Sequence, residues 1–147
     1  MKTRIVRDRR AGAISLSVRP QKGEVIDYAL AEWLRGADDG NLLEFTYNLA
    51  GGGAELFFDL TGTETLPRYL KHAKLTSVQF QRMVCAVRDM LSLCTERGIA
   101  TSLVRFDAEF VRVAEDGGLR FALVPLSGVH AVAANSPAML LTYLSAH

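Results

Sequence analysis

The feature of this sequence that most constrains its fold is a long amphipathic pattern over residues 77–97. Apolar residues recur there at spacings of three and four, as on a helix with one buried face. They are Phe80, Met83, Val84, Val87, Met90, Leu91 and Cys94. Thr76 and Gln79 match a capping box, and Gly98 is a suitable C-terminal cap. We therefore expect 77–97 to be the central helix of the fold.

Alternating patterns on both sides of this helix predict strands. Residues 13–20, AISLSVRP, carry an apolar side chain at every second position and end at a proline, as in a half-buried strand. Residues 43–60 are typical of a hairpin joined through the triple glycine at 51–53, because glycine readily adopts positive φ. A second hairpin is expected from residues 109–115 and 119–124, joined by Asp-Gly-Gly.

Three shorter segments are predicted to be helical. Residues 24–37 show an amphipathic pattern formed by Val25, Ile26, Ala29, Leu30, Trp33 and Leu34. Residues 65–73 form a short helix with a proline in its first turn, and a final helix starts at Ser136 before another proline. Residues 131–135 connect these elements through small side chains. The fold class that follows is α+β, with a small antiparallel sheet packed on helices.

The domain organisation is simple. A chain of 147 residues can bury a sizeable core without disulfides or metals. We expect residues 13–147 to be a single α+β domain, preceded by a basic N-terminal arm or edge strand over residues 1–12.

The basic segment is formed by Lys2, Arg4, Arg7, Arg9 and Arg10. It could contact phosphate or anionic lipid, or it could be a solvated arm or an edge strand kept soluble by its charges. We favour the second interpretation, because no aromatic side chains that would stack on bases lie nearby. A net charge of +1 selects neither acidic nor basic partners. We therefore do not expect a nucleic-acid partner. Direct membrane insertion is not expected either, because no apolar run approaches the roughly 20 residues of a membrane span.

The cysteines and histidines give no catalytic or metal site. Cys85 and Cys94 lie on opposite faces of the predicted helix, about 13 Å apart along its axis, so they cannot form a disulfide with each other. Free thiols indicate a reducing compartment, and we expect the protein to be cytoplasmic. Neither His72, His130 nor His147 has a second ligand at a metal-binding spacing. We expect no catalytic residues, no cofactor and no metal.

Three pairs of carboxylates are candidates for acid–base chemistry. Asp38 with Asp39 and Glu115 with Asp116 fall in turn-forming segments, where solvent keeps carboxylates ionised. Asp107 and Glu109 are more interesting, because they follow the long helix and precede the second hairpin. We interpret these two residues also as capping or surface groups.

The order of elements resembles the middle of a protein kinase. LFFDLTGTETLPRYLKHAKL, residues 56–75, resembles the hinge and the first helix of the C-terminal lobe. ERGI, residues 96–99, resembles the turn before the catalytic loop, and FDAEFVRVAEDGGLRF, residues 106–121, resembles the segment that carries the magnesium-binding asparagine and its hairpin. The resemblance implies a reduced, pseudokinase-like core.

The catalytic groups of a kinase are absent from the matching positions. Residues 101–103 are Thr-Ser-Leu in place of His-Arg-Asp, and the metal-binding asparagine falls at Ala108 or Phe110. The Asp-Phe-Gly position falls near residues 123–125, which are Leu-Val-Pro. There is no glycine-rich loop, the early strand lacks the phosphate-pairing lysine, and Glu32 therefore has no lysine partner. Phosphoryl transfer depends on these groups, so we do not expect an enzyme.

A closer resemblance is to an uncharacterised domain found N-terminal to forkhead-associated (FHA) domains in Firmicutes and Actinobacteria. FFDLTG at 57–62, KLT at 74–76 and DAEFVRV at 107–113 carry it, within a match over roughly residues 42–125. The resemblance implies a non-catalytic interaction module of a signalling protein, with phosphothreonine proteins bound through an FHA domain outside this chain. The alternative is a cytoplasmic pseudokinase-like component of a type VII secretion or cell-envelope apparatus, since the related EssB/YukC domain shares the pattern.

Overall fold

The computed structural model describes residues 1–129 and 135–147. Within these residues the chain is a mixed α+β protein with four α-helices and antiparallel sheets, as the sequence predicts. His130 and most of the predicted small-residue connection lie outside the described residues.

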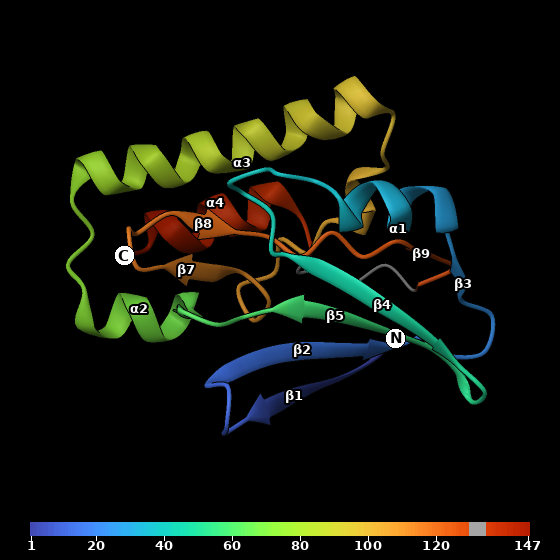
Figure 1. The fold of residues 1–147 in the computed structure, drawn as a ribbon. Helices are drawn as coiled ribbons and strands as arrows, with labels where there is room; N and C mark the ends of the chain where they lie inside the picture. Colours follow the sequence, from blue (N-terminus) through green and yellow to red (C-terminus); the bar gives the residue numbers. More distant parts are fainter. Residues whose placement is uncertain (130–134) are drawn as a thin grey trace.

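The largest sheet contains four antiparallel strands in the order β1-β2-β5-β4, and it lies at the bottom of Figure 1. The strands are β1 (Lys2–Asp8), β2 (Ala13–Arg19), β4 (Phe45–Ala50) and β5 (Gly53–Asp59). Leu16 pairs with Phe58, which pairs with Phe45, so one buried row crosses β2, β5 and β4. β1 occupies the edge, so the basic segment forms an edge strand.

Two smaller sheets accompany the four-stranded sheet, whereas the sequence predicts a single sheet. In one, β3 (Val25–Ile26) pairs with β9 (Leu126–Ser127). In the other, β7 (Arg112–Ala114) lies between β6 (Thr63–Thr65) and β8 (Leu119–Arg120). The second hairpin is therefore shorter than expected.

The predicted helix over residues 24–37 was too long at its start. Asp27 is the N-cap of α1 (Tyr28–Arg35), and its side chain accepts a hydrogen bond from the Leu30 amide. Val25 and Ile26 belong to β3 instead, because the β9 backbone pairs with them in a strand conformation. Val25 is 61% exposed, so it does not belong to the buried face of a helix.

The other three helices form where the sequence predicts them. They are α2 (Leu66–His72), α3 (Ser77–Arg97) and α4 (Pro137–Ser145). Thr65 and Ser136 cap α2 and α4, each with a proline in the first turn. The α3 helix has the full Thr76–Gln79 capping box, in which each side chain bonds the other residue's amide.

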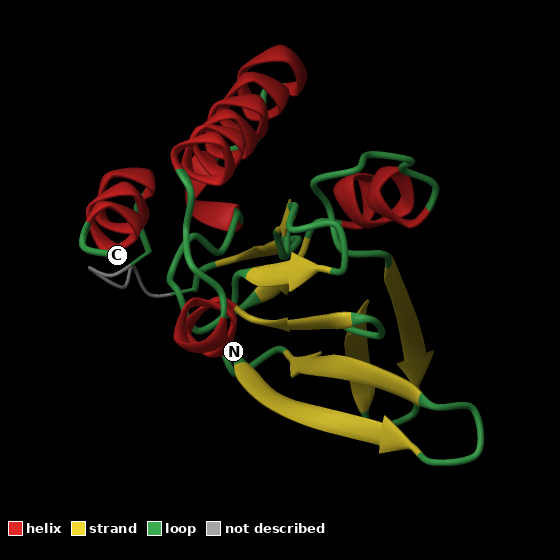
Figure 2. Cartoon of the chain, turned by 90° about the vertical axis from the view of Figure 1, so that its left-hand side faces the viewer, coloured by secondary structure: helices red, strands yellow, loops and turns green. Residues whose placement is uncertain are grey.

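The α3 helix buries one face, as its apolar spacing predicts. Met83, Val87, Met90 and Cys94 are each 2% exposed or less, and Ala86 between them is also buried. Phe80, Val84 and Leu91 flank this row and are half-buried. In Figures 1 and 2 the helix runs along one side of the molecule, with α4 beside it. Its buried residues belong to the same core cluster as those of the four-stranded sheet.

The two glycines Gly98 and Gly128 give a prediction about backbone strain. Gly98 ends α3 at φ +65, and an added Cβ would meet nothing within 4 Å. Gly128, at φ +81, would place a Cβ 2.5 Å from the Gly23 carbonyl oxygen. Gly98→Ala should cost about 1–2 kcal/mol of unfolding free energy from the left-handed conformation alone, whereas Gly128→Ala adds a backbone clash and should cost more. Urea unfolding of both variants checks this order, and equal losses would contradict it.

Candidate functional site

The segment after α3 carries a buried ion pair between Arg105 and Asp107. Gly98 ends the helix, and a short 3-10 turn follows at Thr101–Leu103. The backbone then runs against residues 122–124: Val104 bridges Leu123, and the Arg105 amide donates to the Ala122 carbonyl at 2.9 Å. This pairing holds the next residues, up to Asp107, against the core.

Arg105 and Asp107 form a buried ion pair within this segment. Arg105 Nη2 donates to Asp107 Oδ2 at 3.1 Å, and the two side chains are 7% and 9% exposed. Arg105 Nε and Asp107 Oδ1 are also buried and have no hydrogen-bond partner in the described part of the chain. The pair is therefore joined by a single hydrogen bond. It does not form the bidentate arrangement, with two parallel hydrogen bonds, that arginine and carboxylate often adopt.

The burial of Asp107 corrects the interpretation of both acids as capping or surface groups. Only Glu109 is exposed. An arginine and an aspartate two residues apart in an extended segment point to the same side. The apolar neighbours Val104 and Phe106 are both buried, so the segment is buried on both faces. The sequence R-F-D inside an apolar ribbon was the available signal.

Two further contacts hold this segment in place. The Arg105 guanidinium lies 5.0 Å from the centre of the Phe110 ring, close enough for a cation–π contact. The Phe106 amide donates to Asn135 Oδ1 at 2.7 Å, and Asn135 Nδ2 donates to the Ser102 carbonyl at 3.3 Å. Asn135 thus ties the start of α4 to the loop after α3.

A hollow of about 400 Å³ lies beside the ion pair. Leu103, Val124 and Leu126 contribute apolar walls, and Arg105, Ser102 and Asn135 contribute polar groups. The volume falls in the range of small-molecule sites. No acidic residue is among the described residues that line the hollow.

The positions that the sequence resemblance aligns with a kinase active site hold structural groups. Residues 101–103, which the resemblance aligns with His-Arg-Asp, form the 3-10 turn. Leu123 and Val124, which it aligns with the region of the metal-binding aspartate, are buried. Glu32 on α1 accepts a hydrogen bond from the Tyr47 hydroxyl on β4 and pairs with Arg35 at 2.9 Å. The hydrogen bond to Glu32 raises the pKa of the Tyr47 hydroxyl, so the proton stays on tyrosine.

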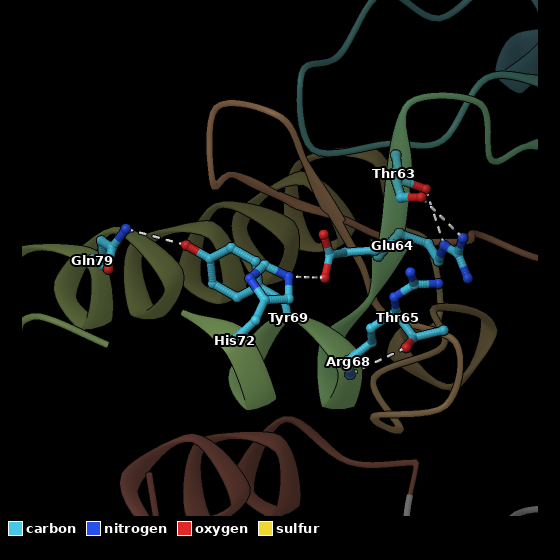
Figure 3. Close-up of polar contacts among 8 residues, drawn as sticks. Thr63, Glu64, Thr65, Arg68, Tyr69, His72 and Gln79 are labelled. Atoms are coloured by element: carbon cyan, nitrogen blue, oxygen red, sulfur yellow. Dashed lines mark hydrogen bonds and ion pairs between the residues drawn. The ribbon is translucent and has the colours of Figure 1, made fainter. Parts of the chain in front are cut away.

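A second polar cluster joins α2 to its neighbours, as Figure 3 shows. His72 Nε2 lies 2.5 Å from Glu64 Oε1 on β6, and the Tyr69 hydroxyl accepts from Gln79 on α3 at 3.1 Å. On the neighbouring strand β7, Arg112 Nε donates to Thr63 Oγ1 of β6 at 3.0 Å. Burial lowers the pKa of the Arg112 guanidinium. The cluster fixes α2 between two strands and α3.

The remaining acidic pairs and histidines stay apart. Asp39 accepts from the Asn41 amide and Asp116 from the Gly118 amide, both in turns. His147 is exposed at the end of α4. Among the residues that the structure describes, no group of three or more His, Cys, Asp or Glu could hold a metal ion. No described helix is both long and apolar enough to cross a bilayer.

The basic edge strand is partly neutralised by its own sheet. Glu55 on β5 lies 3.5 Å from Arg4 and 3.3 Å from Arg19. Ser17, expected on the polar face of β2, is 1% exposed and donates to Glu55 at 2.5 Å. This hydrogen bond and the two guanidinium groups lower the pKa of the Glu55 carboxyl.

The two cysteines differ in accessibility, which predicts different reactivity. Cys94 is 1% exposed, and burial raises the pKa of its thiol, while Cys85 is half-buried on α3. The thiolate is the reactive form. Iodoacetamide at pH 8 should therefore modify Cys85 first and Cys94 only after unfolding in guanidinium. Peptide mass spectrometry measures this order, and rapid labelling of Cys94 in the folded protein would contradict the core assignment.

Comparison with known proteins does not assign the chain to a family. No family model matches the chain, and no curated protein matches it significantly.

Proposed function

We propose that this chain is a non-catalytic interaction module with a reduced kinase-like core, the N-terminal part of an FHA-domain signalling protein of the cytoplasm. The observation that carries the proposal is the Arg105–Asp107 pair. Asp107 is the acid nearest to the position of a kinase catalytic loop, and it is buried against an arginine. A general base must reach its substrate proton, which a carboxylate in this setting cannot do.

The order of elements supports the kinase-like part of the proposal. Strand β5 is followed, after the short β6, by α2, by the long α3, by the 3-10 turn and by the β7–β8 hairpin. This is the order of elements on which the resemblance rests. The positions that the resemblance aligns with kinase catalytic residues hold a 3-10 turn and a buried leucine and valine. A scaffold of this kind acts through its surface, to which other proteins bind.

Calorimetric titration with ATP and magnesium tests the proposal. Without metal ligands and a phosphate-pairing lysine, we expect no saturable heat up to about 1 mM nucleotide, which corresponds to binding weaker than about 4 kcal/mol. A parallel titration without magnesium is the control. Saturable binding that requires magnesium would refute the non-catalytic assignment.

A further inference from the structure

We propose that the open edge of β1 binds an extended acidic segment of a partner protein as a fifth strand of the four-stranded sheet. Among the described residues β1 pairs only with β2. In Figures 1 and 2 it forms the lower rim of the molecule. The inference goes beyond the proposed function, because it depends on the chemistry of this edge and not on the kinase-like core.

The backbone of β1 offers hydrogen bonds to such a strand. Every residue of β1, from Lys2 to Asp8, has a partner on β2 in one unbroken antiparallel register. In this arrangement alternate residues of the edge strand point their N–H and C=O groups away from the sheet. Addition of a strand to an open edge of this kind is a common mode of peptide recognition.

An exposed apolar residue marks the place where the buried row of the sheet ends. Ile5 on β1 pairs with Leu16, and the row continues through Phe58 to Phe45. The three inner side chains are 7% exposed or less, whereas Ile5 is 49% exposed. An apolar side chain opposite Ile5 on an added strand covers it and extends the row by one strand.

The charges at the edge select an acidic strand. Exposed cations lie along β1 and in the turn after it, at Lys2, Arg7, Arg9 and Arg10. Within the part of the chain that the structure describes, none of these four forms an ion pair. Asp8 is the only acid within residues 1–12, and its carboxylate accepts from two amides of its own turn. Charged edges oppose pairing with strands of like charge, so a second copy of this chain fits less well than an acidic segment.

Two like-charge contacts in the fold also favour an anionic partner. Lys2 lies opposite Arg19 on β2, and like charges in opposite positions destabilise a sheet. Burial and, to a smaller extent, the charge of Arg7 lower the pKa of the Arg112 guanidinium, so Arg7 also lies near a second cation. Carboxylates opposite Lys2 and Arg7 on an added strand relieve both contacts.

The probe is the peptide Glu-Glu-Thr-Glu-Val-Val-Thr-Thr-Glu, blocked at both ends. Aligned antiparallel to residues 2–10, it places a glutamate opposite each unpaired cation of this segment and a valine opposite Ile5. The amide chemical shifts of β1 report binding by NMR. A matched peptide with lysine in place of every glutamate should bind at least about tenfold more weakly, because each attractive pair becomes repulsive.

N-methylation of the probe distinguishes strand pairing from a purely electrostatic contact. Two peptides, methylated at complementary sets of alternate residues, each lose the N–H donors along one edge of the extended chain. Only the peptide whose methylated edge faces β1 should lose binding, by at least about tenfold. A contact made by charge alone treats both peptides alike.

A charge-reversed variant assigns the binding to β1. Lys2→Glu with Arg7→Glu places opposite charges beside Arg19 and Arg112, so the fold should be kept. The variant should reverse the preference and bind the lysine peptide at least about tenfold more tightly than the glutamate peptide. This reversal is measured within one folded protein and does not depend on its stability relative to the wild type.

Lys74→Glu with Arg88→Glu is the matched control. Both residues are exposed, and they lie before and within α3, which Figure 1 shows across the molecule from β1. The control changes the net charge by the same amount, so it should keep the preference for the glutamate peptide.

Four results would overturn the proposal. They are the absence of saturable shifts with the glutamate peptide up to about 5 mM, equal binding of the lysine peptide, equal binding of the two N-methylated peptides, and an unchanged preference in the charge-reversed variant. A protein that is already dimeric through β1 and does not bind the peptide would replace the acidic partner with a second copy. None of these outcomes involves nucleotide, so this proposal and the proposed function fail separately.

Discussion

Met90→Asp is expected to unfold the domain. Met90 is 1% exposed and lies at the centre of the buried face of α3, between Val87 and Cys94. Loss of its apolar burial removes roughly 1.5–3 kcal/mol, and an unpaired buried carboxylate costs several kcal/mol more. The sum is comparable to the whole stability of a typical domain, about 5–15 kcal/mol.

Circular dichroism melting and the recovery of soluble protein measure this effect. Ser92→Asp, two residues away on the exposed face, introduces the same charge into the same helix and should shift the melting temperature by no more than a few degrees. A Met90→Asp protein that melts like the wild type would show that α3 does not face the core.

Asp107→Ala is expected to have the second-largest effect. It leaves the Arg105 guanidinium buried at 7% side-chain exposure without its carboxylate. Removing one partner of a buried pair typically costs about 3–5 kcal/mol, because the remaining charge is uncompensated. Guanidinium unfolding should show this loss with little change in cooperativity.

The double variant separates the pair from its surroundings. Arg105→Met with Asp107→Ala removes both charges, so it should be more stable than Asp107→Ala alone, in keeping with buried pairs that can be replaced by apolar groups. The coupling energy of the cycle should exceed about 1 kcal/mol. Additive single effects would mean that the two side chains do not interact in solution.

Acidic pH should weaken the four-stranded sheet through Glu55. The folded state lowers the pKa of this carboxyl, chiefly through the Ser17 hydroxyl. The stabilisation is therefore present above the pKa of an ordinary glutamate and is lost as the pH falls through the lower folded value. Ser17→Ala should reduce this acid sensitivity, as measured by melting temperature between pH 7 and pH 3; an unchanged pH profile would contradict it.

Local signals in the sequence predicted much of the fold. The capping box and the three-four spacing located α3, and the triple glycine located the β4–β5 hairpin, because each signal acts within a few residues. Val25 and Ile26 were assigned to a helix because an apolar pair beside a helix fits either structure. Their strand partner β9 lies about a hundred residues away, at Leu126–Ser127, and no local pattern reveals it.

The candidate site was only partly accessible to sequence reasoning. The identity of residues 101–103 as Thr-Ser-Leu, on which the expectation of no enzyme rests, could be read directly from the sequence. The burial of Asp107 was indicated only weakly, by R-F-D inside an apolar segment, since it depends on the pairing of that segment with Ala122 and Leu123. Tertiary contacts therefore decided whether this acid was a surface group or half of an internal ion pair.

The most direct test of the central claim, a kinase-like scaffold without the means of phosphoryl transfer, is the release of labelled phosphate from ATP with magnesium. We predict release equal to the protein-free blank at every protein concentration. Release that rises in proportion to the protein, and that requires magnesium, would contradict the account.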